Sequence, residues 1–261
     1  MIKLCLITPI ENIELSNYSD IFFALTRQLQ ELDGYYTYFK QKKKLGFDVI
    51  VDNNIHESQE VDFEIHVKLA LDVGTIIVVP DVLRNKKKTL EYFHYFMDRW
   101  YSVLKQNDIK IMAVPQGDTI EEINECFEEF NNDRRVDIIG NSFDLVPYQL
   151  TKEKYENQSL NRILIVNKWC EKTEKKIHLL GSNNLNELYV LSKLKQVYST
   201  DGKFFSRISL AGIELNSENW RSAIKKMNIK MDFKQKLNLT QTNLFIKNIL
   251  FFREVLHDKH I

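Results

Sequence analysis

The sequence predicts an α/β protein built as a (β/α)8 barrel of the TIM type. Short apolar runs recur along the chain, with helical patterns between them, and the runs end on Pro, Gly, Asp or Gln. Runs without alternation are typical of parallel strands covered on both faces. Polar side chains at strand ends are typical of a barrel whose site lies on its C-terminal face. The length of 261 residues also fits one barrel.

The clearest apolar run covers residues 109–117, Ile-Lys-Ile-Met-Ala-Val-Pro-Gln-Gly, and ends on Gln116 and Gly117. Further strands are predicted at residues 3–8, 48–52, 75–81, 135–140, 176–181 and 206–212, with another short strand just before Asp201. The range 206–212 completes the set of eight strands.

Helices are predicted between the strands. Phe22, Leu25, Leu29 and Leu32 recur at helical spacing and predict a helix over residues 21–32. Thr119, followed three residues later by Glu122, forms a capping box at the start of another helix. The remaining helices are predicted at residues 61–71, 90–104 and 185–194, and in a segment that runs through Trp169.

The whole chain, residues 1–261, is expected to form a single domain, with the barrel over about 1–212 and a helical part over about 213–261. Residues 217–261 predict two or more helices with a basic face, made of Arg221, Lys225, Lys226, Lys230, Lys234 and Lys236.

The composition sets limits on partners and compartment. Lys+Arg and Asp+Glu balance at 36 each, so a nucleic acid would have to bind a local basic patch. Cys5, Cys126 and Cys170 lie far apart without metal spacing, which favours a reduced, cytoplasmic protein over a zinc site or a disulfide framework. Neither a signal peptide nor a membrane span is expected.

Two local patterns have both a functional and a structural interpretation. Residues 35–45 interleave aromatic side chains with lysines, as single-strand binders do, but a helix with core-facing aromatics is favoured. Residues 56–66 contain acids and two histidines, His56 and His66, without the i, i+4 histidine pair of a helical metal site. No metal is therefore expected. A lysine run at residues 86–88 is most simply a solvated surface.

The predicted strand ends carry a distinctive set of groups: Asp52, Asp81, Gln116, Gly140 and Asp201. Two acids can act as nucleophile and general acid at an acetal carbon. A third acid, with an amide and free backbone groups, can bind the edge of a flat heterocycle. This set therefore predicts cleavage of an N-glycosidic bond to a purine.

Motifs in this order resemble the tRNA-guanine transglycosylase superfamily, and most closely its compact phage-type branch, which places 7-deazaguanine derivatives into DNA. The resemblance runs to about Gly212 and rests on Leu6-Ile7-Thr8-Pro9, Val49 to Glu57, Val78-Val79-Pro80-Asp81-Val82, Ala113-Val114-Pro115-Gln116-Gly117, Ile138-Ile139-Gly140, His178-Leu179-Leu180-Gly181 and Tyr198-Ser199-Thr200-Asp201.

The resemblance implies base exchange on a polynucleotide without a cofactor. By matching motif position, Asp201 would be the nucleophile at C1′ and Asp52 the general acid/base. The base edge would be held by Asp81, Gln116, Gly117 and Gly140. The implied partners are DNA and a base such as 7-cyano-7-deazaguanine, in the host cytoplasm if the chain is phage-encoded. Ser199 is the alternative occupant of the nucleophile position.

The chain also departs from the family. The tRNA enzymes carry a Cys/His zinc site after the nucleophile, whereas this chain has no cysteine beyond Cys170, so the zinc subdomain is absent. This departure favours DNA over tRNA. Asn53 and Asn54 are bulkier than the small residues that usually follow the acid matching Asp52. The alternatives are a tRNA enzyme, a non-catalytic nucleic-acid-binding relative and a small-glycoside hydrolase. The oligomeric state stays open.

Overall fold

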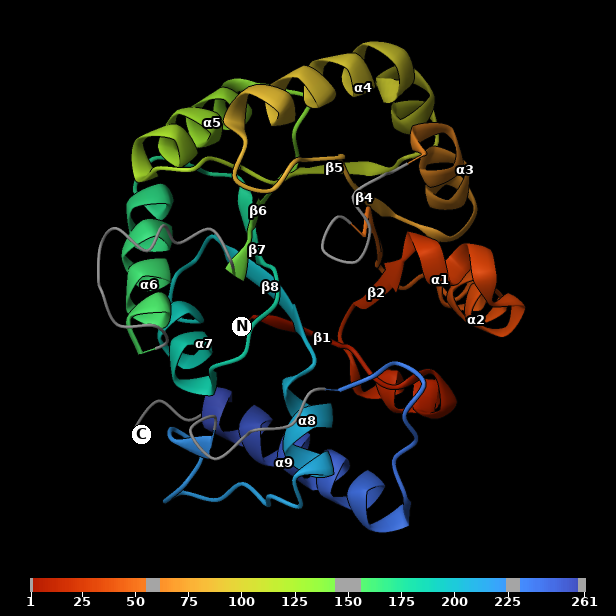
Figure 1. The fold of residues 1–261 in the computed structure, drawn as a ribbon, viewed down its shortest axis with the longest axis vertical. Coiled ribbons are helices and arrows are strands. Elements are labelled where there is room, and N and C mark those ends of the chain that lie inside the picture. Colours follow the sequence, from red (N-terminus) through yellow and green to blue (C-terminus); the bar gives the residue numbers. More distant parts are fainter. Residues whose placement is uncertain (1, 55–61, 144–155, 224–230, 258–261) are drawn as a thin grey trace.

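The computed structural model describes residues 2–54, 62–143, 156–223 and 231–257. Eight parallel strands form one sheet in the order β1-β8-β7-β6-β5-β4-β3-β2. The sheet curves into a nearly closed barrel with helices around its outside (Figure 1). The predicted (β/α)8 architecture is confirmed.

The eight strands are short, and each is parallel to its neighbours in the sheet. They are β1 (Lys3–Leu6), β2 (Phe22–Leu25), β3 (Val49–Asp52), β4 (Ile76–Val78), β5 (Lys110–Ala113), β6 (Ile138–Asn141), β7 (Lys176–Leu179) and β8 (Val197–Gly202).

The described helices lie mostly between successive strands. They are the 3-10 helix η1 (Ile10–Tyr18) and the α-helices α1 (Thr26–Glu31), α2 (Asp33–Lys44), α3 (Phe63–Val73), α4 (Lys86–Gln106), α5 (Ile120–Asn132), α6 (Glu156–Cys170), α7 (Leu185–Leu191), α8 (Phe204–Leu210) and α9 (Leu239–His257).

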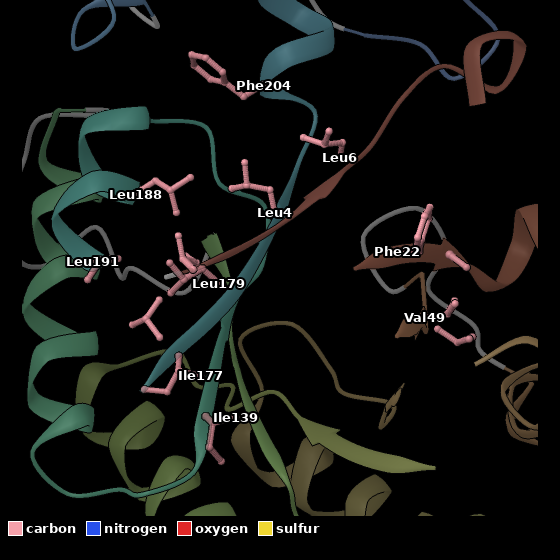
Figure 2. Close-up of a cluster of buried hydrophobic side chains, with 14 of the residues drawn as sticks. Leu4, Leu6, Phe22, Val49, Ile139, Ile177, Leu179, Leu188, Leu191 and Phe204 are labelled. Carbon is pink, nitrogen blue, oxygen red and sulfur yellow. The ribbon is translucent and has the colours of Figure 1, made fainter. Parts of the chain in front are cut away.

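The strands are apolar because they are buried on both faces. In β3, Ile50 packs into a cluster inside the barrel, whereas its neighbour Val51 belongs to the larger cluster between strands and helices. Figure 2 shows part of that larger cluster, including Leu179 of β7 and Leu188 of α7. The absence of alternation that predicted these strands thus has its cause in two hydrophobic cores.

The barrel has a seam between β1 and β2, which are not hydrogen-bonded neighbours in the sheet. The segment before β2 bridges part of this seam. The Leu4 amide donates to Asp20 Oδ2 at 2.9 Å, and the Leu6 amide donates to Ser19 Oγ at 2.9 Å. Arg253 of α9 donates to Asp20 Oδ1 at 2.9 Å, so the C-terminal helix braces the same aspartate.

Two of the predicted elements are wrong, and the errors are linked. The predicted helix over residues 21–32 begins only at Thr26, because residues 22–25 form strand β2. The predicted eighth strand over residues 206–212 is instead helix α8, which starts at Phe204. In α8, Phe204, Phe205 and Ile208 are buried at helical spacing. In such a short segment, two or three apolar residues fit the pattern of a helix and that of a strand equally well.

Several local predictions are confirmed. Thr119 caps α5 by accepting from the Glu122 amide at 3.2 Å. The segment at residues 35–45 lies largely in α2, where Tyr35 and Phe39 are buried, so the structural interpretation of this segment holds. The lysines at residues 86–88 form the first turn of α4, which therefore begins earlier than predicted.

The helical part predicted after the barrel is confirmed, but its described basic residues do not form a helix face. Within the described ranges, residues 217–261 contain one α-helix, α9, and it packs against α8 (Figure 1). Arg221, Lys234 and Lys236 lie in turns and connecting backbone rather than on a helix. Lys225, Lys226 and Lys230 lie outside the described residues. No described helix combines the length and apolar character needed to cross a bilayer.

Candidate active site

A cavity of about 510 Å³ opens at the C-terminal ends of the strands. Four of the predicted side chains line it together: Asp52, Asp81, Gln116 and Asp201. Parallel strands bring these residues to one face of the barrel although they are far apart in the sequence. The cavity therefore concentrates three carboxylates and an amide in one space.

Asp81 is held by two amide side chains. It is 3% exposed, and its Oδ1 accepts from Asn53 Nδ2 at 2.7 Å while its Oδ2 accepts from Gln116 Nε2. The amide of Arg84 donates to Gln116 Oε1 at 3.2 Å, which fixes the orientation of the Gln116 amide. Asp81 thus presents a carboxylate of fixed orientation to the cavity.

Asp201 lies within β8 and is almost fully buried. Its Oδ1 accepts from the Gly181 amide at 3.0 Å and lies 3.2 Å from His178 Nε2. Both contacts involve Oδ1, so the Asp201 carboxylate is held in place through this one oxygen. The alternative nucleophile position, Ser199, is 0% exposed and lies 2.7 Å from His178 Nδ1. Asp201, not Ser199, is the one that lines the cavity.

Asp52 ends β3 and is less buried than Asp81 or Asp201. Its Oδ2 accepts from the Asn54 amide at 3.0 Å. Asn54 has a φ of 61°, in the left-handed region that Asn tolerates better than most residues. The two asparagines after Asp52 thus have distinct structural tasks: Asn53 orients Asp81, and Asn54 turns the chain.

The two predicted glycines do not line the cavity. A Cβ on Gly140 would lie 2.8 Å from Val114 Cγ2, inside the barrel. A Cβ on Gly117 would lie 2.6 Å from Glu122 Cβ, at the start of α5. Both positions require close packing that only glycine allows, and both support the residues beside them rather than border the cavity.

Two cations also line the cavity, Lys203 and Arg207. Lys203 Nζ lies 4.2 Å from the centre of the Phe233 ring, and Arg207 Nη1 donates to Asn183 Oδ1 at 3.3 Å. Burial lowers the pKa of Arg207. These side chains add positive charge to the lining of a cavity that also contains the three carboxylates.

Those acids and histidines considered for a metal that the structure describes have other partners. Asp62 accepts from the Glu64 and Ile65 amides as the cap of α3, and Glu64 pairs with Arg99. His56 and Glu57 lie outside the described residues. Among the residues that the structure describes, no group of three His, Cys, Asp or Glu side chains could hold a metal ion.

His66 lies buried behind the Asp52 strand end. Its Nε2 is 2.8 Å from the Val78 carbonyl oxygen, and its Nδ1 is 2.7 Å from Thr26 Oγ1. Thr26 Oγ1 also donates to the Asp52 carbonyl oxygen at 2.6 Å, so one hydroxyl proton serves two acceptors when His66 is neutral. Burial lowers the pKa of His66 from 6.5 to about 4.

Acidification is expected to destabilise the fold through His66. As the pH falls, His66 binds a proton near pH 6.5 in the unfolded chain but only near pH 4 in the folded chain. The unfolded state is therefore protonated at His66 first. The free energy of unfolding should drop by roughly 3 kcal/mol over this window. Urea denaturation should show that wild type exceeds His66→Gln in free energy of unfolding by less at pH 4 than at pH 7. A constant difference would contradict the assignment.

Sequence reasoning missed Asn53, His178, Lys203 and Arg207. Asn53 and the two cations follow strand-end acids within a few residues, which is a usable signal. His178 is fully buried, and its ring stacks on that of Phe23 with 6.1 Å between the ring centroids. Its contact with Asp201 depends on the register of β7 and β8, which the sequence alone did not supply.

The fold and the cavity define a (β/α)8 barrel with a carboxylate-rich site at the C-terminal face of its strands. No protein-family model and no curated protein matches this sequence. The chemistry of the site therefore rests on its own side chains.

Proposed function

We propose that this protein is a guanine transglycosylase that exchanges guanine in DNA for a 7-deazaguanine derivative, through a covalent intermediate on Asp201. One observation carries the proposal: Asp52, Asp81, Gln116 and Asp201 line a single cavity. They are four of the six residues to which the family resemblance assigns nucleophile, acid/base and base-binding roles; the other two, Gly117 and Gly140, do not line the cavity.

The base-binding side of the cavity suits a guanine edge. Guanine presents N–H donors at N1 and N2 beside an O6 acceptor. Asp81 can accept hydrogen bonds from these donors. Gln116 Nε2 donates one of its two hydrogens to Asp81 and can donate the other to O6. Asn53 keeps the Asp81 carboxylate in place. A cavity of about 510 Å³ is in the usual range for a small ligand.

The reaction then needs two groups on the sugar side. Asp201 Oδ2 attacks C1′ of the target nucleotide, and the C1′–N9 bond breaks as Asp52 gives a proton to the leaving guanine. The incoming base loses its N9 proton to Asp52 and attacks C1′, which returns Asp201 to its carboxylate form. Every proton and bond is accounted for by these two carboxylates.

DNA is the favoured polynucleotide. The target base has to leave the stack before C1′ and the base edge can be reached, and Lys203 and Arg207 at the cavity supply positive charge for a backbone phosphate. The chain also lacks the cysteines of the zinc site that the tRNA enzymes carry.

The direct test is incorporation of labelled guanine and of labelled 7-cyano-7-deazaguanine into duplex DNA and into tRNA, each offered separately to the purified chain. Incorporation into DNA alone is the expected result. Incorporation into tRNA alone would move the protein to the RNA enzymes. Salt-sensitive binding of DNA without incorporation would instead favour a non-catalytic relative.

A further inference from the structure

His178 belongs to a directed chain of hydrogen bonds that ends on Asp201. The histidine is 0% exposed, with Nδ1 2.7 Å from Ser199 Oγ and Nε2 3.2 Å from Asp201 Oδ1. Its ring stacks on Phe23 with an angle of 10° between the planes. Packing on one side and two polar contacts on its edge hold the ring in one orientation.

The position of the ring proton follows from its neighbours. An ionised carboxylate only accepts, so Asp201 requires the proton on Nε2. Ser199 Oγ can then donate its hydrogen to the unprotonated Nδ1. With the Gly181 amide, Asp201 Oδ1 accepts two N–H bonds. These donors leave Oδ2 for the substrate and concentrate negative charge on the oxygen that does not react.

We propose that His178 is a positioning residue that favours release of Asp201 from the sugar, and this inference rests on the proposed function. An N–H group binds a carboxylate about twice as strongly as a neutral carbonyl. When the covalent ester forms, Oδ1 becomes such a carbonyl. When the incoming base attacks C1′, the C1′–Oδ2 bond breaks and its electron pair returns to the carboxylate. His178 and Gly181 therefore stabilise the departing carboxylate more than the ester.

The consequence is a shift in the covalent equilibrium. Wild type mixed with duplex DNA and no added base should hold a small fraction of protein–DNA adduct, balanced by the released guanine. His178→Asn shortens the side chain, so that its amide lies near the former Nδ1 and cannot reach Asp201. The adduct fraction relative to free chain should rise on the order of tenfold, whereas turnover with labelled base should fall.

Two matched variants separate positioning from structure. His178→Gln carries an amide nitrogen near the former Nε2 and can still donate to Asp201, so its adduct fraction should stay near that of wild type. Ser199→Ala keeps the ring but removes the hydroxyl that donates to Nδ1. The ring then loses one of the two polar contacts that hold Nε2 toward Asp201, so the equilibrium should shift in the same direction by less. Ser199→Ala also gives an answer if His178→Asn does not fold.

The experiment is a denaturing gel of each variant with labelled duplex DNA, alongside urea denaturation of the free proteins. A raised adduct fraction in His178→Asn and Ser199→Ala, with His178→Gln near wild type, supports the inference. The inference is overturned if wild type forms the adduct and the adduct fractions of His178→Asn and Ser199→Ala are equal to or smaller than that of wild type. Absence of both adduct and base exchange in wild type would instead overturn the proposed function, and the inference with it.

Discussion

Asp201→Asn is expected to abolish base exchange while the fold survives. The amide is too weak a nucleophile to displace guanine, so the exchange rate should fall by at least about 10³-fold. Asn keeps the size of Asp, and its carbonyl oxygen can still accept from the Gly181 amide. The measurement is incorporation of labelled 7-cyano-7-deazaguanine into duplex DNA, with the adduct followed on a denaturing gel.

The matched control for Asp201→Asn is Asp137→Asn. Asp137 precedes β6 at the opposite end of the barrel, where its Oδ2 accepts from the Ile111 amide at 2.8 Å. The same chemical change there should leave exchange close to wild type. An unchanged rate in Asp201→Asn would remove this residue from the mechanism, whereas equal losses in both variants would point to a general loss of the fold.

Arg162→Met is expected to be among the most destabilising single changes in the chain. Arg162, on α6, is 1% exposed and donates to Asn141 Oδ1 at 2.8 Å, the Asn141 carbonyl at 2.8 Å and the Leu180 carbonyl at 2.9 Å. It also pairs with buried Glu187 of α7 at 3.3 Å. Breaking a buried pair by removing one partner costs about 3–5 kcal/mol, because the other charge is left uncompensated.

A second change should restore part of that loss. Arg162→Met with Glu187→Leu removes both charges, and apolar replacement of a whole buried pair is often close to neutral. Burial raises the pKa of Glu187, and Arg162 offsets part of that rise. Without Arg162 the pKa of Glu187 is raised further, so the loss of folding stability in Arg162→Met should grow as the pH increases above about 4.5. Urea denaturation at pH 5 and pH 8 tests this; a loss of equal size at both would contradict the role of the Glu187 charge.

Most of the strands could be predicted from sequence because their cause is local. A buried parallel strand needs a short apolar run, and Ile50 and Val51 show that each face of such a run has its own core to contact. Strand β2 was missed for the same reason. Its four buried residues precede α1 directly, so Phe22 and Leu25 continue the apolar spacing of the helix, and only pairing with β3 separates the two.

The site could be predicted as a set of strand-end residues but not as a network. The face of the barrel follows from strand direction alone, which places Asp52, Asp81 and Asp201 together. The partners that orient these carboxylates depend on register. His178 lies beside Asp201 because β7 and β8 pair with an irregularity between Ile177 and His178, and nothing in the apolar pattern specifies that shift.

The seam between β1 and β2 has a consequence for how the chain folds as it is synthesised. Among the described strands, β1 pairs with β8, with Lys3 opposite Ser199. β1, the earliest of the described strands, can therefore form its ladder only after β8, the last of them, has been synthesised, whereas β2 to β7 can pair progressively with strands close in sequence. Contacts of such wide sequence separation slow folding. Closure of the barrel, and with it assembly of Asp201 into the cavity, should be a late event.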